Sequence, residues 1–320
     1  MRFREIGILV FLVILAGATT VREPRFLSAK NLTDILLDIP LLMVVAMGMT
    51  MIILSRNIDL SVGSTLGLSA IIVGFIFKSN PNFPVWAGAI IGILVGLLLG
   101  ALNGILVTWL RVPAIIATLG TLNVFRGLVF VVSGGQEVGA NDIPPSLIEL
   151  SRTSPIQLPW IVIFAVLVTI ATHLFLRYTR TGREIYAIGS SPKAARLRGI
   201  QVEKVVFLAF TLTGGFAGLA GIMYASRYGF INPLTTGAGL ELSVIAATII
   251  GGTNILGGSG SVPGTVLGCL LLGVINNALV ITNLSAFWQL AIYGVVILIA
   301  VAVDSLIRRQ LERAAVDQTR

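Results

Sequence analysis

Long apolar stretches alternate with short polar ones along almost the whole chain. A helix needs about 20 mostly apolar residues to cross a bilayer, and somewhat fewer where the bilayer thins. Ten stretches meet or approach this length, so the pattern predicts an all-α polytopic membrane protein with about ten transmembrane helices. The predicted spans are centred near 6–21, 35–55, 64–78, 85–110, 112–133, 158–176, 205–225, 239–252, 262–282 and 286–303.

Composition supports this fold class and leaves little room for a soluble one. Of the 320 residues, 56% are hydrophobic and 11% are charged, and the mean hydropathy is +0.97. A soluble domain would carry roughly a quarter charged residues. The net charge of +8 would also suit a nucleic-acid-binding protein. The basic residues lie in short runs between apolar stretches, however, so we expect no nucleic-acid partner and interpret residues 1–320 as a single transmembrane domain.

The distribution of lysine and arginine predicts the orientation. Ten spans leave both ends on one side, and if that side is cytoplasmic, fifteen basic residues lie inside and six outside. The positive-inside rule therefore predicts N-in and C-in, with a cytoplasmic loop at 177–204 and a cytoplasmic tail at 304–320. The first stretch could instead be a cleavable signal peptide, because Arg2 and Arg4 precede it and "AGA" follows at 16–18. We expect a retained first helix.

The 177–204 loop contains a compact helix signature. Ser191 can cap a helix, Pro192 suits the first helical position, and Gly199 can end the last turn. The helix between them has about two turns, which is too short to be stable alone in water. This predicts that the helix packs against something else.

The two faces of this short helix differ in chemistry. Ala194 and Leu197 are three residues apart and share a face, while Lys193 and Arg196 share another. A small apolar face with a basic rim would suit a shallow, partly acidic groove on a protein. The alternative is a solvated loop attracted to anionic lipid.

A short internal repeat links the two halves of the chain. "LLLGALNGILV" at 97–107 matches "LLLGVINNALV" at 270–280, which places Asn103 opposite Asn276 at an offset of 173 residues. The same offset shifts the chain by five predicted spans, and an odd shift turns one copy upside down relative to the other. The sequence therefore predicts an inverted repeat of spans 2–5 and 7–10, an arrangement known from transporters.

The third and eighth spans, which the offset makes equivalent, are the two shortest. Each is joined on the predicted cytoplasmic side to a polar, turn-rich segment, "SRNIDLSVGS" at 55–64 and "GGTNILGGSGSVPG" at 251–264. Short or glycine-interrupted segments at such positions point to the transport pathway. Each segment could be a tight connector or a moving gate, and the sequence leaves both open. The candidate pathway and gate residues are Asn57, Asp59, Ser61, Asn103, Asn254, Gly257, Gly258, Gly260 and Asn276.

Two ionisable residues fall within predicted spans, Arg126 in the fifth and Glu241 at the start of the eighth. Unpaired charges in the membrane are costly, so such residues usually pair or face water. We expect a salt bridge that braces two helices, with direct contact to a substrate as the alternative. Asp59 lies nearer the cytoplasmic surface, where it could pair with Arg56 or cap the following helix.

Several enzyme classes are excluded by missing motifs. A Walker A loop needs Gly-Lys-[Ser/Thr], and none of the four lysines follows a glycine. No HExxH motif is present, and we expect no metal site. The chain is therefore not expected to be an enzyme.

Five motifs, in order along the chain, resemble the sugar-import permeases of bacterial ATP-binding-cassette (ABC) transporters, of the ribose, autoinducer-2 and rhamnose type. They are "NIDLSVGS" (57–64), "ATLGTLNVFRG" (117–127), "GREIYAIGSSPKAARLRGI" (182–200), "GAGLELSVIAA" (237–247) and "GGTNILGGSGSVPGTVLG" (251–268). "SRNIDLSVGS" looks more like the autoinducer-2 and rhamnose members than the ribose ones. Ala238 and Asn254 depart from the threonine and serine that many relatives carry.

The resemblance implies a role for the short cytoplasmic helix. In this family the loop between spans six and seven carries the coupling helix, which docks on the ATPase subunit. The matching residues here are Ser191, Pro192, Lys193, Ala194, Ala195, Arg196 and Leu197. ATP and magnesium would then be bound by the ATPase subunits, and this chain itself would carry no cofactor.

The resemblance also implies partners, a location and a function. The partners are cytoplasmic ATPase subunits, a periplasmic sugar-binding protein, a second permease subunit that is identical or related, and the lipid of the bacterial inner membrane. The function would be import of a sugar or sugar-like solute such as autoinducer-2, rhamnose or ribose. The alternative is a secondary sugar transporter driven by an ion gradient, which would need no ATPase and commonly carries carboxylates near the midplane.

Overall fold

The fold is given by a computed structural model, which describes residues 3–152 and 158–283 and, beyond them, Trp288, Ala291, Gly294, Val295 and Leu298. Twelve α-helices and one short 3-10 helix lie in these ranges. Their bounds are α1 Phe3–Arg22, η1 Pro24–Leu27, α2 Ala29–Leu54, α3 Val62–Ser79, α4 Val85–Thr108, α5 Ala114–Ser133, α6 Pro145–Glu149, α7 Trp160–Tyr178, α8 Arg180–Ser190, α9 Pro192–Leu197, α10 Val202–Tyr228, α11 Leu240–Ile250 and α12 Val262–Ile281.

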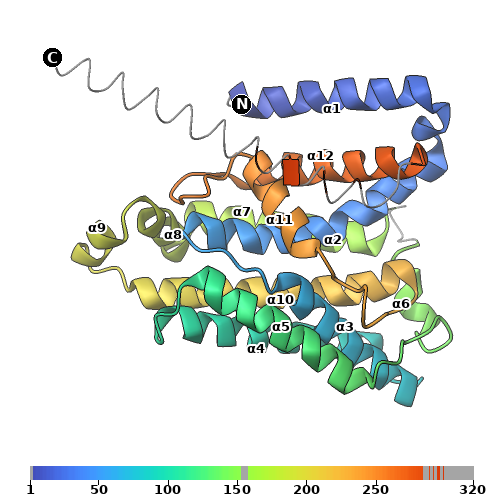
Figure 1. Cartoon of the computed structure of the whole chain (residues 1–320), viewed down its shortest axis with the longest axis horizontal. Helices are drawn as coiled ribbons and strands as arrows, with labels where there is room; N and C mark the ends of the chain where they lie inside the picture. The colour runs from blue at the N-terminus through green and yellow to red at the C-terminus, as the bar shows by residue number, and fades with distance from the viewer. Residues whose placement is uncertain are drawn as a thin grey trace.

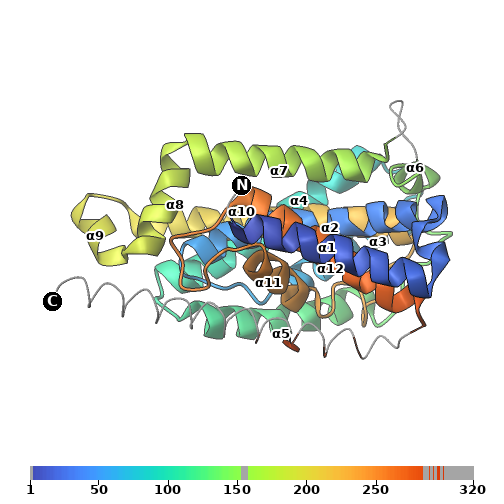
Figure 2. The ribbon, with the colours of Figure 1, turned by 90° about the horizontal axis from the view of Figure 1, so that it is seen from above.

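The long helices run side by side in one bundle, and the connecting segments gather at its two ends (Figure 1). Helices α8 and α9 lie at one end, and α6 lies at the other, as the view from above also shows (Figure 2). We call these the α9 end and the α6 end. At the α6 end an antiparallel bridge between Val138 and Ile231 ties two connecting segments together.

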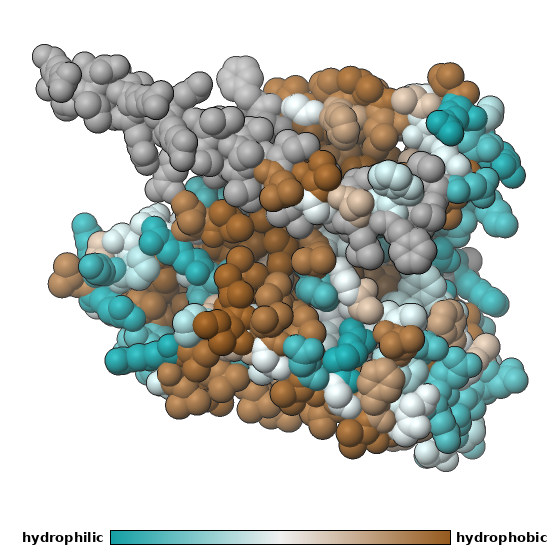
Figure 3. Space-filling model, in the orientation of Figure 1, coloured by the Kyte–Doolittle hydropathy of each residue, from teal (hydrophilic) through white to brown (hydrophobic). Residues whose placement is uncertain are grey.

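The surface fits a bundle that sits in lipid. Apolar residues dominate the middle of the face in Figure 3, and polar residues gather toward both ends. Seven helices of the described chain are long and apolar enough to cross a membrane: α2, α3, α4, α5, α7, α10 and α12. The all-α polytopic fold class is therefore confirmed.

The predicted count of ten spans is not reached among the described residues. The apolar part of α1, Ile6–Arg22, and all of α11 are shorter than the seven spanning helices. The predicted tenth span lies almost wholly outside the described residues, as does the whole of the predicted tail at 304–320. Ten spans, and the N-in, C-in topology that depends on an even number, stay predictions.

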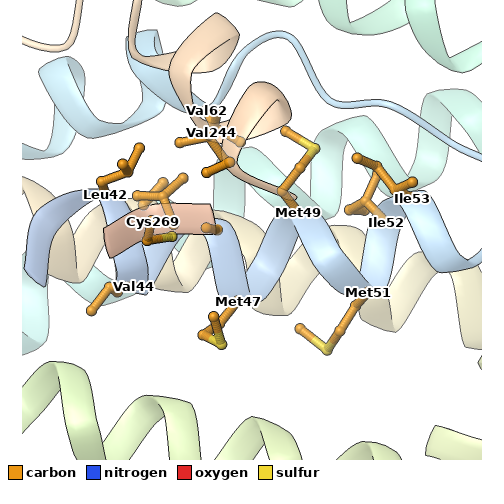
Figure 4. Close-up of a cluster of buried hydrophobic side chains, with 14 of the residues drawn as sticks. Leu42, Val44, Met47, Met49, Met51, Ile52, Ile53, Val62, Val244 and Cys269 are labelled. Atoms are coloured by element: carbon orange, nitrogen blue, oxygen red, sulfur yellow. The ribbon is translucent and has the colours of Figure 1, made fainter. Parts of the chain in front are cut away.

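From Ile39 to Leu54 helix α2 is apolar on nearly every side, as expected for a helix enclosed by others. All residues of α2 from Ile39 to Leu54 are buried except Met43. Figure 4 shows Met47 and Met51 pointing to one side of α2 and Met49 to the other, where Val244 of α11 also lies. Unbranched methionine fills irregular gaps well, which suits a helix with neighbours on all sides.

Helices α4 and α10 approach each other through glycines. Gly96 and Gly100 of α4 lie against Gly214 of α10, and Gly92 lies against Gly218. A methyl group on Gly96 would overlap the carbonyl oxygen of Gly214. Lipid tails are as apolar as leucine, so membrane helices associate through such close packing of small residues rather than through exclusion of water.

The helix ends repeat with the spacing seen in the sequence. Adding 173 to the bounds of α2, residues 29–54, gives 202–227, and α10 spans Val202–Tyr228. Adding 173 to α4, residues 85–108, gives 258–281, and α12 spans Val262–Ile281. Helices α2 and α10 pack on each other, α10 packs on α3 and α4, and α2 packs on α11 and α12. The packing of α2 on α11 and α12 thus corresponds, under the 173-residue offset, to the packing of α10 on α3 and α4.

Helices α3 and α11 begin inside the bundle. Residues 57–61 form a non-helical segment that leads inward from the end of α2, and Asp59 and Ser61 on it are buried. Helix α11 has only 11 residues, about 16 Å or half of the apolar thickness of a bilayer. The start of α3 at Gly63 packs directly on the backbone of Gly237, just before α11. Two helix N-termini therefore meet within the protein.

Candidate functional site

The cytoplasmic loop predicted from the sequence folds into two capped helices. The Thr179 hydroxyl accepts a hydrogen bond from the Gly182 amide at 3.0 Å and starts α8. The Ser191 hydroxyl accepts one from the Ala194 amide at 3.3 Å and starts α9, with Pro192 at its first position. Gly199 follows with φ of +77°. The helix predicted between Ser191 and Gly199 is confirmed, whereas α8 before it was not predicted.

Helix α9 presents one side to the protein and the other to the outside. Ala195 is buried, whereas the Leu197 side chain is 90% exposed, and Lys193 and Ala194 are exposed as well. Nη2 of Arg196 lies 2.8 Å from Oε1 of Glu203 at the start of α10. An isolated exposed leucine is common on protein surfaces. On a short helix with basic neighbours, it supplies the small apolar face that the sequence predicts.

Arg56 joins the end of α2 to the end of α8. Its Nε donates to the Gly189 carbonyl oxygen at 2.6 Å, and its Nη2 donates to the Ser190 carbonyl oxygen at 3.0 Å. Carbonyls at a helix C-terminus lack intrahelical donors and carry partial negative charge, which a guanidinium satisfies. Arg56 itself has φ of +66°, an uncommon backbone conformation for a side chain of this size.

The glycine-rich loop at 251–261 packs against the same place. The Gly258 amide donates to the Leu54 carbonyl oxygen at 3.0 Å, and a methyl group on Gly189 would overlap both Leu54 and Gly258. The Tyr186 hydroxyl of α8 also donates to the Gly260 carbonyl oxygen at 3.2 Å. The α8 helix, the 55–61 segment and the glycine-rich loop therefore meet backbone to backbone. We call the contact of Leu54, Arg56, Gly189 and Gly258 the backbone junction.

Asn254 and Gly257 shape the loop rather than reach into the bundle. The Asn254 side chain accepts a hydrogen bond from the Leu256 amide at 2.8 Å, a turn-forming contact typical of asparagine. Gly257 has φ of +83° and its amide donates to the Asn254 carbonyl oxygen at 2.8 Å. Asn57 in the other segment bonds back to Ser55.

A buried polar cluster lies just inside the α9 end. Asp59 accepts from both the amide and the hydroxyl of Ser61, at 2.8 and 2.7 Å. The Asn103 amide group donates to the Ser61 hydroxyl at 2.7 Å, and the Thr121 hydroxyl donates to Asn103 at 2.7 Å. Asp59 and Asn103 are almost fully buried. Neither role expected for Asp59 is seen: Arg56 points to α8, and Asp59 forms a turn with Ser61, the residue before α3, rather than bonding to an amide of that helix.

Arg126 and Glu241 lie against the same face of α3 but do not form the expected salt bridge. Nη1 of Arg126 donates to the Thr236 carbonyl oxygen at 2.8 Å and lies beside Gly67. The Glu241 carboxylate lies against Gly63, one turn away. Their charges attract each other, but no ion pair within 4.0 Å joins these two described residues. Arg126 of α5 thus binds the segment before α11 rather than the Glu241 carboxylate.

A cavity of about 730 Å³ opens toward the α6 end, between α2, α10, α11 and α12. Its walls include Asp34 and Asp38 of α2, Tyr224 and Arg227 of α10, and Asn276 of α12. The volume lies within the range of about 300–1,000 Å³ typical of small-molecule sites. The cavity extends inward to Leu66, Gly237 and Ser243, close to the place where α3 and α11 begin.

Comparison with known proteins shows the family to which this helical bundle belongs. A family model described as "Branched-chain amino acid transport system / permease component" matches residues 31–301. The chain belongs to this permease family. Its members are membrane permeases, so the protein is a multi-pass protein of the inner membrane, in agreement with its seven spanning helices.

Several curated relatives cover nearly the whole chain, and each carries the name "Autoinducer 2 import system permease protein LsrC". The relative from Salmonella paratyphi B is 38% identical over 312 residues, 97% of this chain and 88% of its own length. The one from Photorhabdus luminescens is 37% identical over 98% of this chain and 94% of its own length. The one from Escherichia coli is 38% identical over 97% and 89%. No solved structure matches the chain.

Within this permease the predicted pathway residues separate into three places. Asp59, Ser61 and Asn103 form the buried cluster, Gly258 lies in the backbone junction, and Asn276 lines the cavity. Asn103 and Asn276, which the repeat places opposite each other, therefore do not come together. The polar and aromatic cavity residues are not among the residues predicted from the sequence. Their spacing could have indicated a shared helix face, since Asp34 and Asp38 are four residues apart, as are Tyr224 and Tyr228.

Proposed function

We propose that this chain is the transmembrane permease subunit of an ATP-driven importer for autoinducer-2 or a related sugar-like solute. The main structural support for this proposal is the backbone junction, where the α8–α9 unit contacts both the 55–61 segment and the glycine-rich loop. A displacement of the α8–α9 unit would reach the glycine-rich loop through backbone contact and the 55–61 segment through the Arg56 guanidinium. The family match and the names of the relatives support the same class of transporter.

The proposed arrangement has the α9 end in the cytoplasm, both chain ends inside, and ten spans built as an inverted repeat of spans 2–5 and 7–10. Its support is the basic character of the α9 end and the shared 173-residue offset of sequence and helix bounds. The proposed site of ATPase docking is the exposed side of α9, with Lys193, Ala194 and Leu197. Arg196 contributes less than expected, because Glu203 already binds its guanidinium.

The proposed partners are cytoplasmic ATPase subunits that bind ATP and magnesium, a periplasmic binding protein that delivers the solute, and a second permease subunit. The test is uptake of autoinducer-2 and of D-ribose into proteoliposomes that hold the assembled complex. We expect uptake to need ATP and the binding protein and to persist when ionophores collapse ion gradients. Uptake that follows an ion gradient without ATP would instead establish a secondary transporter.

Docking at α9 has its own test. Leu197→Ser should reduce co-purification of the ATPase subunits severalfold, because it removes an apolar side chain from the docking surface. Leu234→Ser is the matched control, since Leu234 is also exposed, at 68%, but lies at the α6 end. Equal co-purification of both variants with the ATPase would rule out docking through Leu197.

A further inference from the structure

The cavity at the α6 end combines two carboxylates, one guanidinium and two phenol rings on facing helices. Nε of Arg227 lies 2.9 Å from Oδ1 of Asp38, and its Nη2 lies 3.0 Å from Oδ1 of Asp34. The Arg227 side chain is 19% exposed, and Asp34 and Asp38 are 41% and 46% exposed. Arg227 is thus held in place by α2, and both carboxylates remain open to the cavity.

These carboxylates retain unused hydrogen-bonding capacity. A carboxylate has two oxygens and about four acceptor positions. At each aspartate the contact with Arg227 uses one oxygen, and the Tyr228 hydroxyl adds a weak donor to Asp38 at 3.4 Å. Hydroxyl groups of a bound molecule could donate to the positions that remain. Two fixed acceptors four residues apart on one helix face would favour a molecule with several neighbouring hydroxyls.

The facing wall supplies flat apolar surface. Tyr224 and Tyr228 lie one turn apart on α10, with ring centroids 4.5 Å apart and planes inclined by 46°. Both rings line the cavity. A tyrosine ring offers a broad apolar body with a polar tip, which suits ligands that carry both C–H surface and hydroxyls.

The charges in the cavity argue against an anionic occupant. Asp34 and Asp38 contribute two negative charges and Arg227 one positive charge, so these three side chains leave a net charge of −1. A lipid phosphate or a free carboxylate would meet two carboxylates before a guanidinium that is already bound on two sides. A neutral ligand with donor groups meets no such repulsion.

From these observations we propose that the cavity is a solute-binding site of the permease itself, for a neutral polyhydroxylated molecule of monosaccharide size. Asp34 and Asp38 accept from its hydroxyls, and Tyr228 packs on its apolar face. Ser243 of α11 and Asn276 of α12 complete the lining, and the bound molecule would face the start of α11. This inference rests on the proposed transport function, because a pathway site needs a solute that is carried.

The experiment measures binding to the purified full-length permease in lipid nanodiscs by saturation-transfer difference NMR. The probes are autoinducer-2, D-ribose and L-rhamnose, with L-leucine as a zwitterionic comparison because the family description names branched-chain amino acids. We expect at least one of the three hydroxylated probes to bind and L-leucine not to bind. Binding of L-leucine alone, or of no probe, would overturn the proposal.

Variants of the two walls test the named contacts. Asp38→Asn preserves shape and should weaken binding about tenfold or more, the effect of a hydrogen bond to a charged group. Tyr228→Leu should weaken binding severalfold, and Tyr228→Phe should lose less because it keeps the ring. The controls are Asp142→Asn and Tyr178→Leu, which lie outside the cavity. Unchanged binding in both Asp38→Asn and Tyr228→Leu overturns the proposal.

Folding of each variant is checked by thermal unfolding in detergent. If Tyr228→Leu fails to fold, Asp38→Asn and Asp34→Asn decide, since both preserve side-chain volume. Uptake by the wild-type complex is measured in parallel. Uptake without binding in the cavity would overturn this inference alone, whereas absence of ATP-driven uptake of every hydroxylated probe would overturn the proposed function.

Discussion

Nε of Arg56 lies 2.6 Å from the carbonyl oxygen of Gly189, and this bond ties the last turn of α8 to the first residues after α2. The residues are 133 positions apart in sequence, and the contact brings the 177–204 loop directly onto the segment that leads to Asp59 and Ser61. Since the loop is the proposed docking site of the ATPase subunits, this bond would be the first contact through which their conformational change reaches the membrane helices.

Removal of the Arg56 side chain should separate ATP hydrolysis from transport. Arg56→Gly deletes two charged-donor hydrogen bonds but suits the left-handed backbone at φ of +66°. We therefore expect a net loss of about 1–2 kcal/mol in stability, with ATP hydrolysis retained and uptake reduced severalfold. ATPase rate and uptake are measured together in proteoliposomes.

Arg111→Gly is the matched control for this variant. Arg111 also has a left-handed backbone, with φ of +57°, but it follows α4 and does not bind α8. The control should keep the ratio of uptake to hydrolysis. If both variants change this ratio equally, the hydrogen bond between Arg56 and Gly189 has no specific role in coupling hydrolysis to uptake.

Gly258→Ala should disturb the glycine-rich loop more than backbone strain alone explains. Gly258 has φ of +77°, and a Cβ there would lie 2.8 Å from the Ser190 amide nitrogen. Gly134 has φ of +58° with open space around it, so Gly134→Ala measures the strain by itself, about 1 kcal/mol. We expect Gly258→Ala to lose clearly more stability in thermal unfolding.

The same variant decides between a connector and a gate at 251–264. If the loop moves with α8, uptake by Gly258→Ala should fall while hydrolysis per folded complex persists. If both activities fall only in proportion to folded protein, the loop is a connector.

Asn103→Ala should destabilise the permease by about 1–2 kcal/mol, because it removes the hydrogen bonds that Asn103 makes with the buried Ser61 hydroxyl and with Thr121, while Ser61 keeps its bond to Asp59. Asn123 lies on the exposed side of α5, and Asn123→Ala should change stability by less than about 0.5 kcal/mol. Thermal unfolding in detergent compares the two. Similar small losses would mean that the cluster is not a structural anchor for the 57–61 segment.

Arg126→Ala and Glu241→Ala should act almost independently. Arg126 binds the Thr236 carbonyl oxygen rather than the Glu241 carboxylate, so the coupling between them passes through space along α3. In a double-mutant cycle on thermal unfolding, we expect a coupling energy at or below about 0.6 kcal/mol, the average for polar pairs in membrane proteins. A coupling above about 1.5 kcal/mol would contradict this and point to a direct pair.

Much of the fold follows from the sequence because the bilayer imposes length and polarity on each span. The predicted 85–110 and 262–282 match α4 and α12 within a few residues. The short length of α11 could not be predicted, since glycines follow its apolar residues in the same way whether a helix spans the whole membrane or half of it. Helix α8 was missed because its polar residues resemble a loop, while Ile185 and Ile188 reveal its buried face only once it is folded.

The site was predicted only where it is local in sequence. Helix α9 could be predicted from Ser191, Pro192 and Gly199, because helix-capping preferences depend only on residues within about one turn. The cavity depends on Asp38 meeting Arg227, 189 residues away, and no periodicity specifies such a pair. The expected salt bridge of Arg126 and Glu241 failed for a related reason, since charge alone does not show that a backbone carbonyl is closer.

The glycine seam between α4 and α10 has a mechanical consequence. Two helices in backbone contact at Gly96, Gly100, Gly214 and Gly218 have no side chains between them whose rotamers could absorb a slide. The α4–α10 pair should therefore move as one rigid unit. Opening of the proposed pathway to one side or the other would then require movement of elements that pack against this pair. The short α11, which borders the cavity and leads into the glycine-rich loop, is then the element that we expect to move during transport.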